Sequence, residues 1–184
     1  RHDTSGHAPC CTFYDASGSG ETKDGVYILH SKSDRWNWGQ SNSEFSDTLI
    51  EFDATITIAP VNNNAGAGII CRMHIREDTL IDGYLFAISG DGFYSIRGIS
   101  SSAADPLVDW TYSDTIKQGN QGNKIRATCN GSELKLEVNG ELLARASTTA
   151  AGPQSGTIAF ASISFEKDEP NAEVQFDNLL VSKP

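Results

Sequence analysis

Two pairs of aromatic residues, each with a spacing of two, are well suited to sugar recognition. Trp36 and Trp38 occur in DRWNWGQ, and Trp110 and Tyr112 occur in DWTYS. In an extended segment, residues i and i+2 point to the same side. Aromatic rings stack on the flat C–H faces of sugars, and polar neighbours bind the hydroxyl groups. The alternative is packing, in which one ring of each pair plugs the edge of the fold and the other is partly buried.

A row of hydrogen-bonding cations follows one face of the segment 69–76. One register of this segment is apolar and is expected to face the core: Ile69, Cys71, Met73 and Ile75. The opposite register of a strand then faces outward. It carries Arg72, His74 and Arg76 besides Ile70. Such groups bind sugar hydroxyls, so all three are predicted to lie on an exposed face and to form part of a glycan site.

The four cysteines bear on the compartment and on the core. Cys71 and Cys129 both fall in apolar registers of predicted strands, and two inward cysteines on antiparallel strands can approach to a Cα separation of about 5.5 Å. Four cysteines allow three pairings, and two buried free thiols are the alternative. Because Cys10 and Cys11 are adjacent in a polar segment, where exposed thiols would be a liability, we favour the disulfide and a location outside the cytoplasm.

Residues 1–11, RHDTSGHAPCC, have no hydrophobic period and are predicted to form an N-terminal arm in front of one domain over residues 12–184. The arm has atoms that bind transition metals, in His2, His7, Cys10 and Cys11, but their spacing matches no known site. A flexible terminus is the ordinary interpretation. A third is a cross-link, in which Cys10 and Cys11 bond each other or a neighbouring copy and so make a covalent homo-polymer.

The last third of the chain predicts an antiparallel meander. Apolar and polar residues alternate with the period of a half-buried strand over 125–129 and again over 134–138. Asn130-Gly131 and Asn139-Gly140 separate these segments, and Asn-Gly favours the type I′ turn of a tight hairpin. Gly, Asn, Ser and Asp recur between short apolar runs throughout the chain, which is typical of two packed antiparallel sheets.

Several segments resemble a known superfamily. They are FSD (45–47), GIICRM (68–73), GYLFAISGDGFYSIRG (83–98), the NxIRxxCxGxxLxLxVNG pattern (123–140) and FDNLLV (176–181). Over residues 12–182 the chain resembles the concanavalin A-like and laminin-G-like jelly rolls, and most nearly the bacterial extracellular modules related to the 3-keto-disaccharide hydrolase domain. The resemblance implies an all-β, two-sheet jelly-roll sandwich. Its motifs are structural, so they indicate fold more strongly than function.

The same resemblance suggests two further sites, one for calcium and one for glycoside hydrolysis. Many jelly rolls bind a structural calcium through an Asp near the last strand, which here implies Asp177 with Asp15 as its companion; the alternative is an Asp that accepts backbone hydrogen bonds in a bulge. Related glycosidases carry alternating carboxylates on one strand, since retaining hydrolysis needs two carboxyl groups. Glu51 and Asp53 begin such a series, but threonines continue it, so a solvated strand face is the better account.

Charge excludes some functions. The chain has a net charge of −10, from 14 Lys and Arg against 24 Asp and Glu, and nucleic-acid binding needs a basic surface. No apolar run approaches the ~20 residues that span a bilayer. Because the chain starts with an arginine, we expect a mature or trimmed form; removal of a secretion signal is one of the origins that the sequence leaves open.

These observations predict an extracellular, non-catalytic domain for glycan binding or cell-surface adhesion, with no cofactor required. The partner would be a glycan or cell-surface polysaccharide. An alternative from another class is a structural subunit of an extracellular filament or coat, assembled through the arm on an edge strand of the next copy. A glycoside-processing enzyme is the weakest alternative and depends on the family resemblance alone.

Overall fold

The computed structural model, which describes residues 13–14, 18–167 and 171–184, is a sandwich of two antiparallel sheets. The eight-stranded sheet has the order β1 (Phe13–Tyr14), β2 (Gly18–Lys23), β3 (Val26–Ser31), β14 (Ala172–Ser182), β5 (Thr48–Ile58), β10 (Asn123–Asn130), β11 (Glu133–Val138) and β12 (Glu141–Ser147). The six-stranded sheet has the order β4 (Trp36–Phe45), β13 (Gly156–Ser164), β6 (Ala65–Ile75), β7 (Ile81–Ser89), β8 (Phe93–Ser100) and β9 (Ala103–Tyr112).

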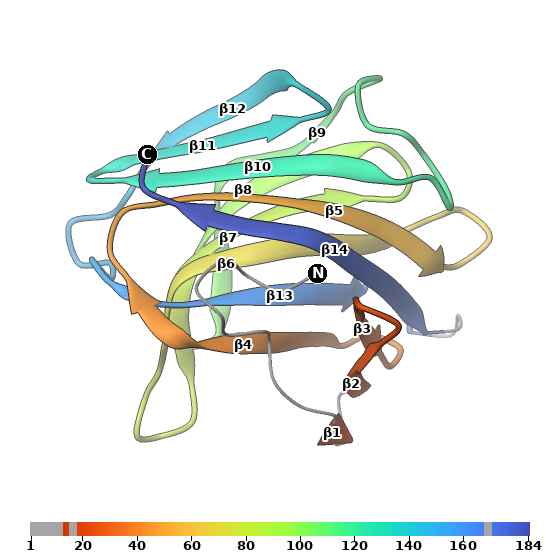
Figure 1. The fold of residues 1–184 in the computed structure, drawn as a ribbon, viewed down its shortest axis with the longest axis horizontal. Coiled ribbons are helices and arrows are strands. Elements are labelled where there is room, and N and C mark those ends of the chain that lie inside the picture. Colours follow the sequence, from red (N-terminus) through yellow and green to blue (C-terminus); the bar gives the residue numbers. More distant parts are fainter. Residues whose placement is uncertain (1–12, 15–17, 168–170) are drawn as a thin grey trace.

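This arrangement confirms the predicted all-β jelly-roll sandwich. The last strand, β14, lies between β3 and β5 of the eight-stranded sheet, and Figure 1 shows it beside β5. The described residues contain no helix. Among them there is accordingly no helix long and apolar enough to cross a membrane. Residues 1–12, 15–17 and 168–170 lie outside the described part of the chain, and with them Asp15, Cys10 and Cys11. The arm, its cross-link and the homo-polymer therefore stay predictions.

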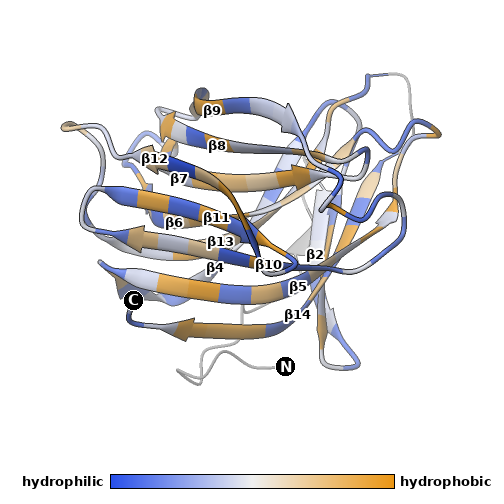
Figure 2. Ribbon diagram, turned by 90° about the horizontal axis from the view of Figure 1, so that it is seen from above, coloured by the Kyte–Doolittle hydropathy of each residue, from blue (hydrophilic) through white to orange (hydrophobic). Residues whose placement is uncertain are grey.

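The core between the sheets follows from strict alternation along the strands. In β5, Ile50 and Phe52 are buried inside while Glu51 and Asp53 face outward, and Figure 2 shows the same alternation of hydropathy along β5 and β11. Rings from three strands meet at the centre, with centroid distances of 5.2 Å for Phe52–Phe160, 6.0 Å for Phe52–Phe176 and 4.2 Å for Phe160–Phe176. Burial of this apolar surface drives the two sheets together.

The two predicted hairpins are present, but only one has the predicted turn. Val138 pairs with Glu141, and both turn residues have positive φ, 52° for Asn139 and 88° for Gly140, as a type I′ turn requires. In the other hairpin Asn130 is the last paired residue, opposite Glu133. The turn is therefore Gly131-Ser132, in which Gly131 has positive φ at the first position, a placement typical of a type II′ turn.

A disulfide joins the two sheets, as predicted. Cys71 of β6 bonds Cys129 of β10 across a Cα separation of 6.8 Å and a sequence separation of 58. The alternative of two buried free thiols is therefore wrong. Both residues are fully buried, so this bond links the two sheets covalently inside the sandwich.

The register of β6 changes directly after Cys71, and here the sequence prediction fails. The pairing of β6 with β7 shifts between Cys71 and His74, and Arg72 has a φ of 52°. A bulge of this kind adds a residue to one strand and re-aims the side chains beyond it. Met73 therefore packs on the outer face of the sheet rather than in the core, and Ile75 is 51% exposed.

Candidate functional site

The outer face of the six-stranded sheet is apolar, in contrast to the charged outer face of the eight-stranded sheet. Side chains that point away from the sandwich core form a second buried cluster of Ile70, Met73, Ile81, Leu85, Ala87, Ile99, Ala159, Ala161 and Ile163. Trp36, Trp38, Trp110 and Phe165 pack against this cluster and stay partly exposed. An aromatic layer thus covers the outer face.

Two rings of this layer show that the outer face is concave. Trp110 of β9 and Phe165, next to the end of β13, make an edge-to-face contact with a centroid distance of 5.5 Å. In the sheet, β6, β7 and β8 lie between these strands, which corresponds to roughly 19 Å along a flat sheet. The sheet must therefore curl toward its outer face. Gly66 allows the approach, because a Cβ atom there would lie 3.3 Å from the Phe165 ring.

A pocket of about 320 Å³ opens beside this contact, and we call it the aromatic pocket. Three rings, two neutral polar side chains and one carboxylate line it: Phe93, Trp110, Phe165, Asn64, Ser89 and Asp91. Most of these residues stand at or just beyond strand ends, namely the ends of β7, β9 and β13 and the starts of β6 and β8. The pocket therefore lies at one end of the curled sheet.

Hydrogen bonds orient the polar side chains of the aromatic pocket. The Ser89 hydroxyl donates to the Asp91 carboxylate and accepts the N–H of Phe93 at 3.2 Å. The Asn64 amide donates to Glu166 at 2.6 Å. Hydrogen bonds from Asn64 and then Asn62 hold the pKa of the Glu166 carboxyl below its ordinary value, so Glu166 stays ionised and fixes Asn64 at the pocket wall.

Tyr112 supports the aromatic pocket from the rim. Its ring contacts Phe93 edge to face at a centroid distance of 5.6 Å, and its hydroxyl accepts a hydrogen bond from Gln118 at 3.3 Å. Tyr112 is 53% exposed, so its free edge is open to a larger ligand.

The predicted glycan-binding residues do not form one site. Trp110 lines the aromatic pocket. Trp36 and Trp38 lie on the same outer face with their rings 5.6 Å apart, packed on the second apolar cluster. His74 and Arg76 line a different cleft, which also includes Tyr84 of β7. Trp36 and Trp38 share the outer face with Trp110, and Tyr112 stands at the rim of the pocket that Trp110 lines.

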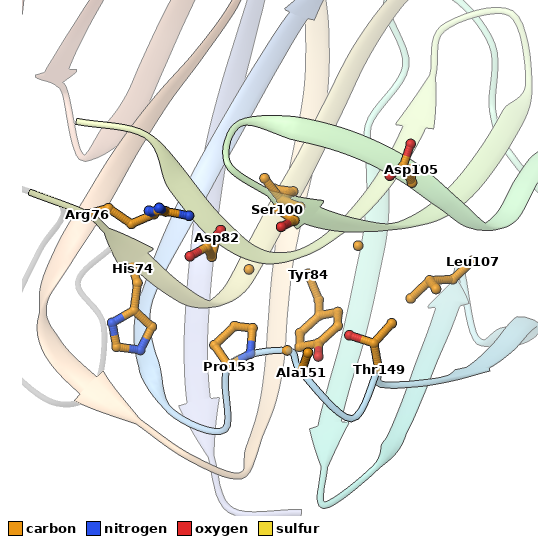
Figure 3. Close-up of a pocket in the computed structure, with 14 residues that line it drawn as sticks. His74, Arg76, Asp82, Tyr84, Ser100, Asp105, Leu107, Thr149, Ala151 and Pro153 are labelled. Atoms are coloured by element: carbon orange, nitrogen blue, oxygen red, sulfur yellow. The ribbon is translucent and has the colours of Figure 1, made fainter. Parts of the chain in front are cut away.

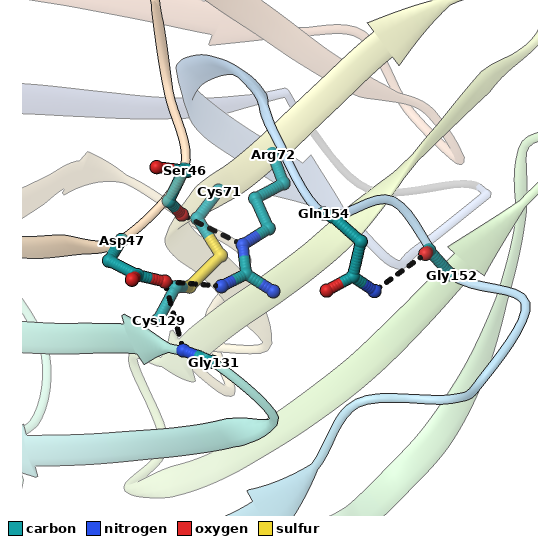
Figure 4. A network of polar contacts seen from close by, with 8 residues as sticks. All are labelled: Ser46, Asp47, Cys71, Arg72, Cys129, Gly131, Gly152 and Gln154. Carbon is teal, nitrogen blue, oxygen red and sulfur yellow. Dashed lines mark hydrogen bonds and ion pairs between the residues drawn. A yellow bond between two sulfur atoms is a disulfide. The ribbon is translucent and has the colours of Figure 1, made fainter.

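Arg72 does not lie on an exposed face, and this prediction is wrong. The bulge turns its side chain inward, where it is 1% exposed. The guanidinium donates to the Ser46 carbonyl at 2.8 Å and to Asp47 at 3.0 Å, and Asp47 also accepts the N–H of Gly131 at 2.9 Å. Figure 4 shows this network beside the Cys71–Cys129 disulfide. Arg72 therefore joins two turns of the sandwich.

The carboxylates of β5 form ion pairs. Glu51 lies 3.0 Å from Arg126 and Asp53 lies 3.1 Å from Lys124, both on the outer face of the eight-stranded sheet. Each partner comes from the neighbouring strand β10. Cross-strand pairs of this kind stabilise a solvated face, which agrees with the interpretation favoured from the sequence.

Asp177 lies at an irregularity of β14, opposite Asp53. Its carboxylate accepts the N–H of Asn178 at 2.7 Å, and Asn178 donates in turn to Asp53 at 2.7 Å. The described residues hold no group of three or more His, Cys, Asp or Glu that could bind a metal, and Lys124 already neutralises Asp53. These described donors do not fit a calcium ion; the companion Asp15 lies outside them, so the calcium site stays a prediction.

Most of the aromatic pocket could not be predicted from the sequence. Asp91 and Phe93 stand in the SGDGF turn, where polar and aromatic residues beside glycines could have suggested a binding loop. Phe165 and Asn64 carried no such signal, because the curl of the sheet, and not sequence spacing, brings them to Trp110.

The comparisons with known proteins agree with this architecture. No family model and no curated protein matches the chain. Among solved structures, the carbohydrate binding module CBM66 from Bacillus subtilis is 17% identical, with a TM-score of 0.64 over 94% of this chain and 91% of that one. This likeness shows the fold, a sandwich of two antiparallel sheets.

Two further solved structures share this sandwich fold. A Bacillus subtilis protein of unknown function with a galectin-like fold is 10% identical, with a TM-score of 0.66 over 96% of this chain and 98% of that one. Alginate lyase A1-II′, a member of polysaccharide lyase family-7, is 10% identical, with a TM-score of 0.63 over 93% and 85%. At such identities the likeness establishes the fold alone, because this fold carries both binding modules and enzymes.

Proposed function

We propose that this domain binds carbohydrate in the aromatic pocket without cleaving it. One observation supports the proposal above all: the rings of Phe93, Trp110 and Phe165 converge with Asn64, Ser89 and Asp91 around about 320 Å³. Ligand sites of proteins begin near this size. The pocket is therefore suited to one or two sugar rings at the end of a chain.

The chemistry of the lining matches that of a sugar ring. A sugar has C–H faces that pack on aromatic rings and hydroxyl groups around its rim. The carboxylate of Asp91 accepts hydroxyl protons in charge-assisted hydrogen bonds, and the Asn64 amide, oriented by Glu166, supplies a donor and an acceptor. The similarity to a carbohydrate binding module supports the same class of ligand.

The carboxylates of the site favour binding over hydrolysis. Asp91 is the one acidic residue among those that line the aromatic pocket, and glycoside hydrolysis by the common mechanisms uses two carboxyl groups that flank the scissile bond. Glu51 and Asp53 lie on the other sheet in ion pairs and cannot supply the second. The domain acts as a binding or adhesion module.

An extracellular or cell-surface location fits this function. The buried Cys71–Cys129 disulfide is of the kind that persists in oxidising compartments. Polysaccharides of cell surfaces are accessible to a protein in such a compartment. The net charge of −10 favours neutral glycans over polyanionic ones, since like charges repel.

A glycan array tests the proposal, with Asp91→Asn as the variant. The parent protein should bind a defined set of glycans, and Asp91→Asn should weaken binding about tenfold because it removes the charged acceptor. The bound glycans are then incubated with the protein and analysed for products. Binding without products supports the proposal; an array without any bound glycan, or cleavage of a bound glycan, refutes it.

A further inference from the structure

A second cleft lies at the opposite end of the strands that form the aromatic pocket, and we call it the polar cleft. It encloses about 510 Å³. Its walls come from the bulged end of β6, the far ends of β7, β8 and β9 and the segment after β12, and Figure 3 shows His74, Arg76, Asp82, Tyr84, Ser100, Asp105, Leu107, Thr149, Ala151 and Pro153 around it. This volume is within the range of small-molecule sites.

The two cavities are separate. Along β7, Asp82 and Tyr84 line the polar cleft and Ser89 lines the aromatic pocket, which puts about 20 Å between the two at the rise of an extended strand. They also lie on opposite faces of the sheet, because Tyr84 belongs to the sandwich core whereas the aromatic pocket adjoins the outer cluster. A ligand in one cavity does not obstruct the other.

An unsatisfied hydroxyl group points to a ligand in the polar cleft. Tyr84 is 1% exposed, and its hydroxyl is buried without a hydrogen-bond partner. Figure 3 shows this ring directed across the cleft toward Ala151 and Thr149. A buried hydroxyl without a partner is unfavourable, and a ligand that displaces the segment around Gly152 would supply that partner.

Glycines give the polar cleft its room. A Cβ atom on Gly98 would meet only Leu107, at 3.9 Å or more, and would otherwise enter the open space. A Cβ atom on Gly152 would overlap the Tyr84 hydroxyl. Glycine at position 152 therefore lets the segment after β12 close over Tyr84, and glycine at position 98 keeps the opposite wall flat.

The remaining polar groups match a polyhydroxylated ligand. Asp82 accepts the N–H of Ser101 at 2.8 Å through one oxygen, and Asp105 makes no side-chain hydrogen bond to another described residue. Arg76 is held by the Ser101 hydroxyl at 2.7 Å and by Asp78 at 3.4 Å. Two carboxylates, a cation and three hydroxyl groups around one cleft can each engage a hydroxyl of the ligand.

We propose that the polar cleft is a second carbohydrate site, for a neutral sugar, so that one domain holds two glycan ends about 20 Å apart and can cross-link them. This inference rests on the proposed function of the aromatic pocket. When both sites of one rigid domain bind the same polysaccharide network, the overall avidity exceeds the affinity of either site alone.

Amide chemical shifts test the second site separately from the first. The ¹⁵N-labelled protein is titrated with methyl glycosides of glucose, galactose, mannose and fructose. Two groups of amides should move: residues 89–93 with the Trp110 indole, and residues 98–100 with Gly152. Shifts in the first group alone overturn the second site and leave the proposed function intact. The absence of shifts in both groups counts against both.

Two variants locate the second group of shifts in the polar cleft. Gly98→Val fills the space without touching the aromatic pocket, so it should abolish the second group only. Tyr84→Phe removes one oxygen from the wall and should weaken the second site about tenfold, with a melting temperature equal to or above that of the parent. Gly98→Ala, which adds a single methyl group, is the milder control for folding. If Gly98→Val and Tyr84→Phe both leave the second group unchanged, the proposal is wrong.

Discussion

At the scale of residues, Arg72 and Arg76 show how one bulge separates two side chains of the same type. Arg72 is buried and bridges Ser46 and Asp47, whereas the side chain of Arg76 is 44% exposed at the polar cleft. The sequence placed both on one exposed face, because simple alternation assigns positions 72 and 76 to the same side. The positive φ of Arg72 breaks that alternation.

This difference makes a prediction about stability. Arg72→Ala should lower the free energy of unfolding by about 3 kcal/mol, because it leaves the Ser46 carbonyl and Asp47 without their buried donor and opens a void. Arg76→Ala is the matched control and should change it by less than about 0.5 kcal/mol, as is usual for exposed residues. Urea unfolding measures both. Equal effects of the two substitutions would contradict the placement of Arg72.

At the scale of elements, the sequence predicts regular strands well and irregular ones poorly. The alternation in β5, β10 and β11 was readable because each strand has one face in the core. The break in β6 after Cys71 was not, because nothing in GIICRM marks the position of a bulge. The turn predicted at Asn130-Gly131 lies one residue further along the chain, at Gly131-Ser132, because strand pairing extends through Asn130.

The cross-sheet disulfide gives the element-scale prediction. The double variant Cys71→Ala/Cys129→Ala should be less stable by about 4 kcal/mol, because the bond closes a long loop in the unfolded chain. Guanidinium unfolding with and without reductant measures this loss. The double variant keeps Cys10 and Cys11, so it also controls for them: reductant should destabilise the parent and leave the variant unchanged. A parent that unfolds at the same midpoint in reductant would show that the bond adds no stability.

At the scale of the whole molecule, curvature decides where the candidate site forms. Trp110 was named from its spacing to Tyr112, but its contact with Phe165 depends on the curl of the six-stranded sheet across three intervening strands. Such a contact joins residues far apart in the chain and leaves no periodic signal. The sequence could therefore predict one wall of the aromatic pocket, that of Trp110. The other lining residues become its neighbours only in the folded structure: Phe93, Phe165, Asn64 and Asp91.

The central claim is that sugar binds on the aromatic pocket, and calorimetric titration of Trp110→Ala beside the parent tests it most directly. The Trp110→Ala variant lacks a ring on which the sugar can stack, so its affinity for a glycan selected on the array should fall at least tenfold below that of the parent. Leu142→Ala serves as control, because Leu142 is an exposed apolar residue of β12 in the other sheet. The Leu142→Ala protein should bind the glycan with the affinity of the parent. A folded Trp110→Ala protein that binds the glycan as tightly as the parent would contradict the account.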